Sequence, residues 1–308
     1  MTQPLPDEWN SDLQPAFKSF FESSHADFLE AGGARVVPID FNLDSEALEM
    51  ELASINGVYI PGDTKQSYED EQYLTAIRRI LAWAGEHNQK EDSHFPIVAV
   101  SWGMLAMLRT QTTQLSLFRG LKDHLVGEAL QQNLHLLPKE TFLYDEIIGF
   151  EFEQTLDEIS FYHEMDEGIT LDDFKKAQQL LHFVPVATYD QADRDQLEEI
   201  VSMVEGTYYP FLGFSYRLDK IQFGFHTSAG EGHEKVDHSR ASIEHAQHIA
   251  NLIVDEARLS GNRYEFTKDE TAKLLRNWDV QLLTLPTPHE FTEKKDYSGE
   301  YRTEIYLF

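Results

Sequence analysis

The stretch PIVAVSWGMLAML, residues 96–108, places a serine between an apolar run and a helix-like segment. The run before Ser101 predicts a buried strand, and the residues after it predict a helix. With Gly103 behind it, Ser101 fits the small-x-Ser-x-Gly pattern of a nucleophile on a tight strand-to-helix turn. Because a serine at this place also caps helices without doing chemistry, the motif by itself leaves both roles open.

Strand-like and helix-like segments alternate on both sides of this turn. Helices are predicted over residues 17–31, 45–54, 68–86, 102–109 and 239–259. Strands are predicted over residues 34–39, 57–60, 96–100, 183–189, 199–204, 210–216 and 301–308. Thr170 and Asp173 match the capped start of one more helix. Strands that are apolar throughout and separated by helices indicate an α/β protein with a parallel sheet covered on both faces. No repeat or linker divides the chain, so we expect one domain over residues 1–308.

The composition excludes several classes of function. The chain has 308 residues, of which 41% are hydrophobic, and this is enough for a sizeable core. It has no cysteine, which excludes disulfides, thiolate metal sites and a cysteine nucleophile. Its 54 acidic and 25 basic residues give a formal net charge of −29, which disfavours binding to nucleic acid or to an anionic membrane. No apolar run approaches the roughly 20 residues that span a bilayer, so we expect no membrane insertion.

Several blocks of the sequence resemble one known family, in the same order along the chain. They read HADFLEAGGARVVPI, INGVYIPGD, FPIVAVSWGMLAM, MVEGTYYPFLGFSYRLDK, HSRASIEHAQHIANLIVDEAR and YSGEYRTEIYLF. Together they resemble the gamma-glutamyl hydrolase family, which has a class I glutamine amidotransferase-like fold. The resemblance implies a flavodoxin-like, three-layer α/β/α sandwich with a mostly parallel central sheet.

The residues that carry the chemistry of this family differ here. Family members cleave gamma-glutamyl bonds in folyl polyglutamates with a Cys nucleophile, a His base and a Glu that orients the base. By the resemblance, Ser101, Arg217 and Asp219 take these three positions. A serine hydroxyl needs a positioned base, and a guanidinium stays protonated and cannot be one. We therefore expect a pseudoenzyme that is retained as a binding or structural subunit of a larger assembly.

Four further residues belong to the same predicted site. Gly62 and Asp63 follow the second strand, where the family's backbone donors stabilise an oxyanion, and Trp102 follows the nucleophile position. We expect these three residues to line the ligand side of the cleft. His163, in the sequence FYH, matches a middle histidine of the family. It is the best candidate for a recruited base if the chain is instead an active hydrolase that uses Ser101.

Two interpretations of Arg217 remain open at this stage. The guanidinium could grip a gamma-glutamyl or other carboxylate ligand in the old cleft, because arginine binds carboxylates bidentately. Alternatively, the Arg217 guanidinium pairs with a neighbouring acid, Asp219 or Asp63, and fills a cleft that no longer binds a ligand.

The histidines suggest two weaker hypotheses. A serine hydrolase of the α/β-hydrolase type would need an acid and then a histidine after Ser101. Its histidine candidates are His226, His233, His238, His245 and His248. The order of the blocks follows the other family, and this disfavours that interpretation. His245 and His248 could share a helix face, but no third ligand is given by the spacing, so we expect no metal site and no cofactor.

The start of the chain and its surroundings leave other questions open. Residues 1–4 resemble the end of a core strand of the family, so either the domain lacks a signal peptide and most of the family's first strand or the given sequence is incomplete, and both alternatives stay open. The family is typically secreted or lysosomal, whereas no signal peptide is visible in MTQPLPDEWNSD, and we leave the compartment open. Family members are commonly homodimers, so a homodimer is the default expectation.

Overall fold

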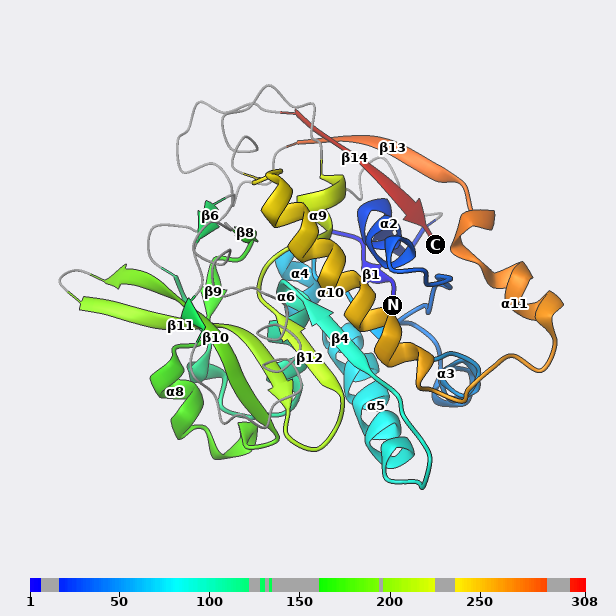
Figure 1. Ribbon diagram of the computed structural model, residues 1–308, viewed down its shortest axis with the longest axis horizontal. Coiled ribbons are helices and arrows are strands. Elements are labelled where there is room, and N and C mark those ends of the chain that lie inside the picture. Colours follow the sequence, from blue (N-terminus) through cyan, green and yellow to red (C-terminus); the bar gives the residue numbers. More distant parts are fainter. Residues whose placement is uncertain are drawn as a thin grey trace.

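A six-stranded sheet runs through the centre of the computed structural model (Figure 1). The structure describes residues 1–6, 17–121, 128–130, 133–134, 161–193, 196–224, 236–286 and 300–308. The strand order is β3 (Val58–Ile60), β4 (Ile97–Val100), β12 (Phe211–Phe214), β11 (Gln196–Gly206), β10 (Phe183–Asp193) and β7 (Asn133–Leu134).

This central sheet is mixed, which corrects the prediction of a mostly parallel one. Strands β3, β4 and β12 are parallel to one another, as expected. The other three join antiparallel, with β11 beside β12, β10 beside β11 and β7 beside β10. The short connection between β10 and β11 explains the antiparallel direction of that pair, because a connection of this length can join only antiparallel strands.

Three smaller sheets complete the strands that the structure describes. One has the order β1 (Gln3–Pro4), β2 (Ser19–Glu22), β14 (Glu300–Leu307) and β13 (Val280–Pro286), with antiparallel neighbours throughout. The other two are the pairs β5 (Arg119–Gly120) with β9 (Glu167–Gly168) and β6 (Glu128–Leu130) with β8 (Phe161–His163).

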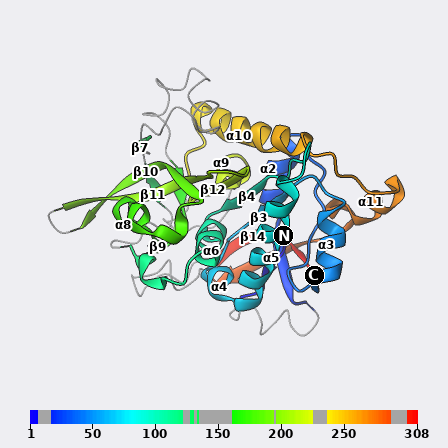
Figure 2. The same ribbon diagram turned by 90° about the horizontal axis from the view of Figure 1, so that it is seen from below.

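Helices cover both faces of the parallel half of the central sheet, with α5 (Glu71–Asn88) and α6 (Trp102–Thr110) on one face and α2 (Ser23–Ala31) and α10 (Arg240–Arg258) on the other (Figure 2). The other helices that the structure describes are α3 (Ser45–Leu52), α4 (Lys65–Glu69), α8 (Leu171–Lys176), α9 (Leu218–Phe223) and α11 (Thr267–Lys273). Of these, α8 packs on β10 and β11. Short 3₁₀ turns lie at Leu115–Leu117, Gln178–Leu180 and Leu275–Asn277.

The alternation of side chains along β4 divides the core into two parts. Ile97 and Ala99 pack in the cluster that contains the buried faces of α5 and α6. Val98 and Val100 pack on the opposite side, against α2 and α10. Since successive side chains of a strand point to opposite faces, one apolar strand serves both clusters. The layers are therefore helix, sheet and helix.

The helix ends follow local sequence signals. Asp70 accepts a hydrogen bond from the Tyr73 N–H at the start of α5, and Ser239 accepts one from the Ser242 N–H at the start of α10. The predicted cap at Thr170 is confirmed, since its side chain accepts a hydrogen bond from the Asp173 N–H. Such caps satisfy backbone donors that have no partner inside the helix.

Two predicted elements are wrong. The helix predicted over 17–31 begins only at Ser23, because residues 19–22 form β2 and pair with β14. The strand predicted over 34–39 is absent from the structure. There the Val36 carbonyl accepts a hydrogen bond from the Leu275 N–H and the Ile39 carbonyl accepts one from the Thr2 N–H. This segment therefore bonds away from the central sheet.

Within the described residues, no helix is both long enough and apolar enough to cross a membrane.

Candidate functional site

Ser101 lies on the strained turn that the sequence predicts between β4 and α6. Its backbone has φ 53° and ψ −131°, a conformation that non-glycine residues rarely adopt. The Ser101 N–H donates to the Phe214 carbonyl at 2.7 Å, and the Ser101 carbonyl accepts from the Met104 N–H at 2.9 Å. These bonds to the neighbouring strand and to the first turn of the helix hold the strained residue in place.

Close backbone packing explains the glycines on both sides of this turn. A Cβ atom on Gly103 would lie 2.4 Å from the Ile60 carbonyl oxygen, and one on Gly62 would lie 1.9 Å from the Gly103 nitrogen. No side chain fits at either position. The loop after β3 and the start of α6 therefore contact each other directly, as a nucleophile turn and its oxyanion loop would.

The groups that would do chemistry at this turn are nevertheless not available in the usual way. The hydroxyl has no hydrogen-bond partner among the described residues, and two nearby N–H groups already donate to other acceptors. The Ser101 Oγ is buried and has no hydrogen-bond partner in the described part of the chain. The Trp102 N–H donates to the Gly62 carbonyl at 3.3 Å, and the Asp63 N–H donates to Gln3 Oε1 at 2.8 Å. Of the predicted oxyanion donors, the Asp63 N–H thus has an internal acceptor, as has the neighbouring Trp102 N–H. The Trp102 side chain is buried and packs against Tyr68.

The neighbouring strand places Arg217 beside this turn. Strand β12 runs parallel to β4 with Phe214 opposite Val100, so the residues that follow the two strands meet at one edge of the sheet. The Arg217 N–H donates to the Tyr162 carbonyl at 2.9 Å, which ties this position to β8. The side chain is only 1% exposed.

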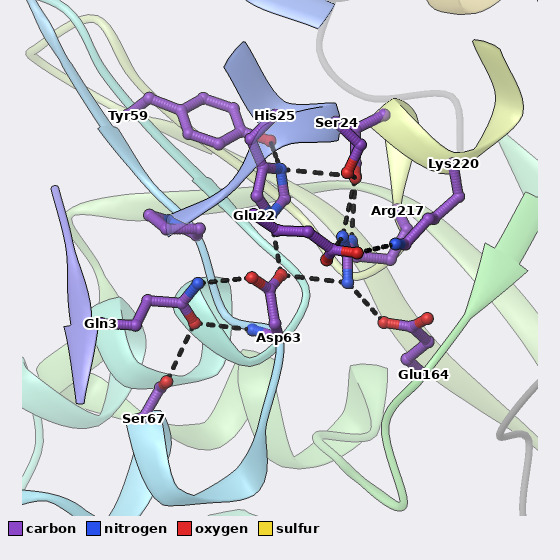
Figure 3. A network of polar contacts seen from close by, with 12 residues as sticks. Gln3, Glu22, Ser24, His25, Tyr59, Asp63, Ser67, Glu164, Arg217 and Lys220 are labelled. Atoms are coloured by element: carbon purple, nitrogen blue, oxygen red, sulfur yellow. Dashed lines mark hydrogen bonds and ion pairs between the residues drawn. The ribbon is translucent and has the colours of Figure 1, made fainter. Parts of the chain in front are cut away.

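The Arg217 guanidinium is surrounded by four carboxylates (Figure 3). Its Nε and Nη2 donate to Asp219 at 2.9 and 2.7 Å, and Nη2 also donates to Glu22 at 2.7 Å. Its Nη1 lies 2.5 Å from Glu164 and 3.0 Å from Asp63. Of the two interpretations of Arg217, the structure thus has the ion pair with Asp219 and Asp63, and it adds two acids that were not predicted.

Two further residues, Lys220 and His25, extend the same network. Lys220 donates to Glu22, which also accepts from Thr303 at 2.6 Å. His25 lies between two of the acids, with Nε2 2.7 Å from Asp63 and Nδ1 3.4 Å from Asp219. Its Nδ1 is also 3.0 Å from the Tyr59 hydroxyl. We call Glu22, His25, Asp63, Glu164, Arg217, Asp219 and Lys220 the charged network.

Burial and the two bases act against each other on the acids of this network. Burial by itself would raise the pKa of Glu22 and of Asp219, but the nearby bases outweigh it and hold both pKa values well below the ordinary range. For Glu164 burial outweighs the attraction of Arg217 and raises the pKa. Burial also opposes the charge of Arg217, but the four acids around it outweigh burial and raise its pKa. It therefore stays protonated and cannot act as a base.

His163 lies in a packed, buried setting and makes no hydrogen bond to the Ser101 hydroxyl. Its ring contacts the rings of Tyr189 and Tyr216, and its Nδ1 lies 3.4 Å from the Ser215 hydroxyl. Burial lowers its pKa to about 3, so the ring is neutral at physiological pH. Since Ser101 Oγ has no hydrogen-bond partner among the described residues, the recruited base predicted for an active hydrolase is not in hydrogen-bond contact.

Among the other histidine candidates, two contact neighbouring residues of the fold and two lie outside the described residues. His238 Nδ1 lies 2.8 Å from the Ile221 carbonyl, and buried His245 packs edge-on against Phe161. Residues His226 and His233 fall in the segment 225–235, which the structure does not describe.

One set of side chains has the spacing of a metal site. Single ligand atoms of Glu22, His25 and Asp219 all lie within 4.8 Å of one another. However, both Glu22 oxygens bind Lys220 or Arg217, and both Asp219 oxygens lie on Arg217. The positions that a metal ion would take on the carboxylates are thus occupied by the two bases.

Most of the charged network was not predicted from the sequence. Glu22 belongs to β2 and His25 to α2, while Glu164 follows β8. His25 and Lys220 each belong to a resembling block but were given no role. Glu22 and Glu164 lie in no quoted block, and the packing of elements far apart in the chain brings them to Arg217. An acid excess around a buried base is the one signal that could have suggested such partners.

A helix–sheet–helix fold with a strained residue between a central strand and its helix defines a class of α/β proteins with a nucleophile-type turn. Comparison with curated proteins gives the family. Gamma-glutamyl hydrolase 1 of Arabidopsis thaliana is 26% identical over 292 residues, which are 94% of this chain and 76% of that protein. Gamma-glutamyl hydrolase of Bos taurus is 23% identical over 268 residues, 86% of this chain and 80% of that protein. The chain is a homologue of the gamma-glutamyl hydrolase family, and the predicted resemblance is confirmed.

Two other comparisons add less. No protein-family model matches the chain. A crystal structure from Thermoplasma acidophilum, described as that of a GMP synthase protein, is 12% identical with a TM-score of 0.41, covering 71% of this chain and 81% of that chain.

Proposed function

We propose that this chain is a gamma-glutamyl hydrolase-like pseudoenzyme, retained as a binding or structural subunit of a larger assembly. The observation that carries the proposal is the state of Arg217. At the position of the family's base, it is a buried, permanently charged group bound by four carboxylates. It can neither accept the proton of Ser101 nor leave its partners without a large cost in free energy.

The geometry around Ser101 supports the same proposal. A general base has to reach the attacking hydroxyl within about 3 Å, directly or through one water. In the described residues Ser101 Oγ has no such partner, and the N–H groups of Trp102 and Asp63 already have internal acceptors. Proton removal therefore lacks a partner for Ser101 among the described residues, and two of the backbone donors near the turn are already engaged.

The alternative is an active hydrolase that uses Ser101 as nucleophile. The strained backbone at Ser101 favours it, because strain of this kind accumulates at functional sites. Such an enzyme would need a rearrangement that brings His163 or another base to the hydroxyl.

Hydrolysis of a folyl poly-gamma-glutamate from acid to neutral pH separates the two functions. We would compare the wild-type chain, Ser101→Ala, and the double variant Ser101→Cys with Arg217→His, after checking by circular dichroism that each is folded. We expect no turnover by the wild type. Turnover that vanishes in Ser101→Ala would make Ser101 a true nucleophile and overturn the proposal. Activity gained only in the double variant would show that the cleft survives and its chemistry was lost.

The proposed assembly has its own test. Light scattering coupled to size-exclusion chromatography measures the mass of the purified chain at several concentrations. A dimer or a larger particle supports the proposal of an assembly of this chain. If the chain is a monomer, the proposed assembly can form only with other proteins. Co-purification of a stoichiometric partner would then reveal it.

A further inference from the structure

A cavity of about 620 Å³ lies at the end of the parallel strands opposite to Ser101. Its lining includes Gly57, which precedes β3, and Pro96, which precedes β4, whereas Asp63 and Ser101 follow those strands. Because β3 and β4 are parallel, residues before them and residues after them lie at opposite edges of the sheet. The cavity thus lies at the other edge of the sheet from the nucleophile turn, although its lining includes Tyr59, whose hydroxyl lies 3.0 Å from His25 of the charged network.

The walls of this cavity are mainly apolar. They come from the segment 34–39, from the sheet and from α10, with the side chains of Val37, Ile39, Val58, Val98, Ile253 and Val254. The segment 34–39, which forms no strand, makes one side of this space. Cavities of about 300–1,000 Å³ with apolar walls and a few polar groups are the usual sites for small organic ligands.

The rim of the cavity reverses the charge of the rest of the protein. Arg35, Arg258 and Arg263 are exposed there, and Glu270 is the single acid among the described lining residues. The chain as a whole has 54 acids and 25 bases, so three arginines against one acid is a local exception. An anion that the rest of the surface repels is attracted at this rim.

Of the three arginines, Arg263 is available for a ligand. Arg35 pairs with Glu270 at 2.5 Å, and Arg258 pairs with Asp255 while its Nη2 lies 3.3 Å from the Gly32 carbonyl. Arg263 has no ion pair with any residue that the structure describes. A guanidinium in this state can take a carboxylate with two parallel hydrogen bonds.

We propose that this cavity binds an amphipathic carboxylate, with its apolar body between α10 and the sheet and its carboxylate on Arg263. The combination of apolar walls and a cationic rim carries the proposal. A purely polar anion would leave the walls unfilled, and a neutral apolar molecule would make no use of the arginines. This site does not depend on the proposed loss of hydrolysis, because it lies at the other end of the sheet.

Calorimetry on the full chain tests both halves of the ligand. Decanoate is the probe, decan-1-ol is its neutral match, and butyrate keeps the charge but removes most of the apolar body. We expect decanoate to bind more tightly than decan-1-ol, and butyrate to give no measurable heat. Equal affinity for decanoate and decan-1-ol, or no binding of decanoate, would overturn the proposal.

Two variants place the binding in this cavity. Arg263→Gln should weaken decanoate binding roughly 5- to 10-fold and leave decan-1-ol unchanged, because a hydrogen bond to a charged group is lost. The matched control is Arg79→Gln on the exposed side of α5, which should change neither. Ala257→Phe, on the cavity wall, should abolish the binding of both long-chain compounds while thermal unfolding shows that the fold remains. Decanoate binding that is the same in all three variants and in the wild type would overturn the site.

Discussion

The turn at Ser101 and the charged network around Arg217 lie at the ends of adjacent strands, yet they differ in what they retain. The turn keeps the geometry of a nucleophile position, with a strained φ and two glycines in direct backbone contact. The network instead has a buried, protonated arginine at its centre, which cannot accept a proton from Ser101. In this chain, the backbone of a nucleophile-type turn therefore lies beside a side chain that cannot act as its base.

This difference between the turn and the charged network has a physical reason. Altering the turn would disturb the packing of β4, α6 and the loop after β3, because a Cβ at Gly62 or Gly103 has no space. Replacing a side chain in the neighbouring cleft disturbs the backbone much less, provided that each new buried charge finds a partner. The chain meets this condition with acids around Arg217 and Lys220. The fold therefore constrains the turn more tightly than the side chains of the neighbouring cleft.

The largest effect is expected from removing the centre of the network. Arg217→Met leaves four buried carboxylates without their main partner and should lower the free energy of unfolding by about 3–5 kcal/mol. Urea unfolding monitored by circular dichroism measures it. The control is Arg240→Met, which removes the exposed ion pair of Arg240 with Glu244 and should leave stability unchanged. If Arg217→Met is as stable as the control, the network does not contribute to the fold.

The next effect concerns His163, which adjoins the network without belonging to it. Burial lowers the pKa of His163, and of His245, from 6.5 to about 3. Between these two pH values the unfolded chain binds a proton at each histidine and the folded chain does not. The free energy of unfolding should therefore fall as the pH falls from 6.5 toward 3, by about 1.4 kcal/mol per pH unit for each histidine.

Denaturation at a series of pH values checks this, with His163→Phe as the variant that removes one histidine. The variant should lose one histidine's share of the slope, about 1.4 kcal/mol per pH unit, in the range from pH 6 to pH 4. Below pH 4 both proteins should lose further stability, because Glu22 and Asp219 have lowered pKa values and must take up protons on unfolding. An unchanged slope in His163→Phe would mean that His163 is charged in the folded protein.

A smaller effect is expected at the turn itself. Gly103→Ala places a Cβ 2.4 Å from the Ile60 carbonyl oxygen and should cost about 1–3 kcal/mol of stability. Gly261→Ala is the matched control, since nothing lies within 4 Å of a Cβ there. Chemical denaturation measures both variants. Equal stabilities would show that the turn can relax, and the contrast between a rigid turn and a replaceable cleft would no longer hold.

The smallest effect is expected for the strained residue. Ser101→Gly relieves the positive φ and should stabilise the protein by about 1 kcal/mol, after allowing for the greater freedom of glycine in the unfolded chain. Ser101→Ala keeps the strain and should leave thermal stability close to that of the wild type. If both variants destabilise the protein alike, the Ser101 hydroxyl makes a contact that supports the fold.

Local sequence signals predicted the turn and most elements of the fold correctly. The apolar run of β4, the serine and the following glycine predict the strand, the turn and α6, because all three depend on near neighbours. The cap at Thr170 and the long helix α10 were predicted for the same reason. The sheet was predicted less well. The local sequence does not show which strands β10 and β11 pair with, and this pairing decides the direction in which they join the sheet.

The sequence by itself predicted most of the elements, the family resemblance and a candidate site at Ser101, Arg217 and Asp219. Only the tertiary structure decided what surrounds Arg217, because Glu22 and Glu164 reach it from elements distant in the chain. The same holds for the cavity below β3, whose walls come from the segment 34–39, the sheet and α10. Residue types limit the chemistry that a site can do, but burial and long-range contacts decide which partner each charge finds.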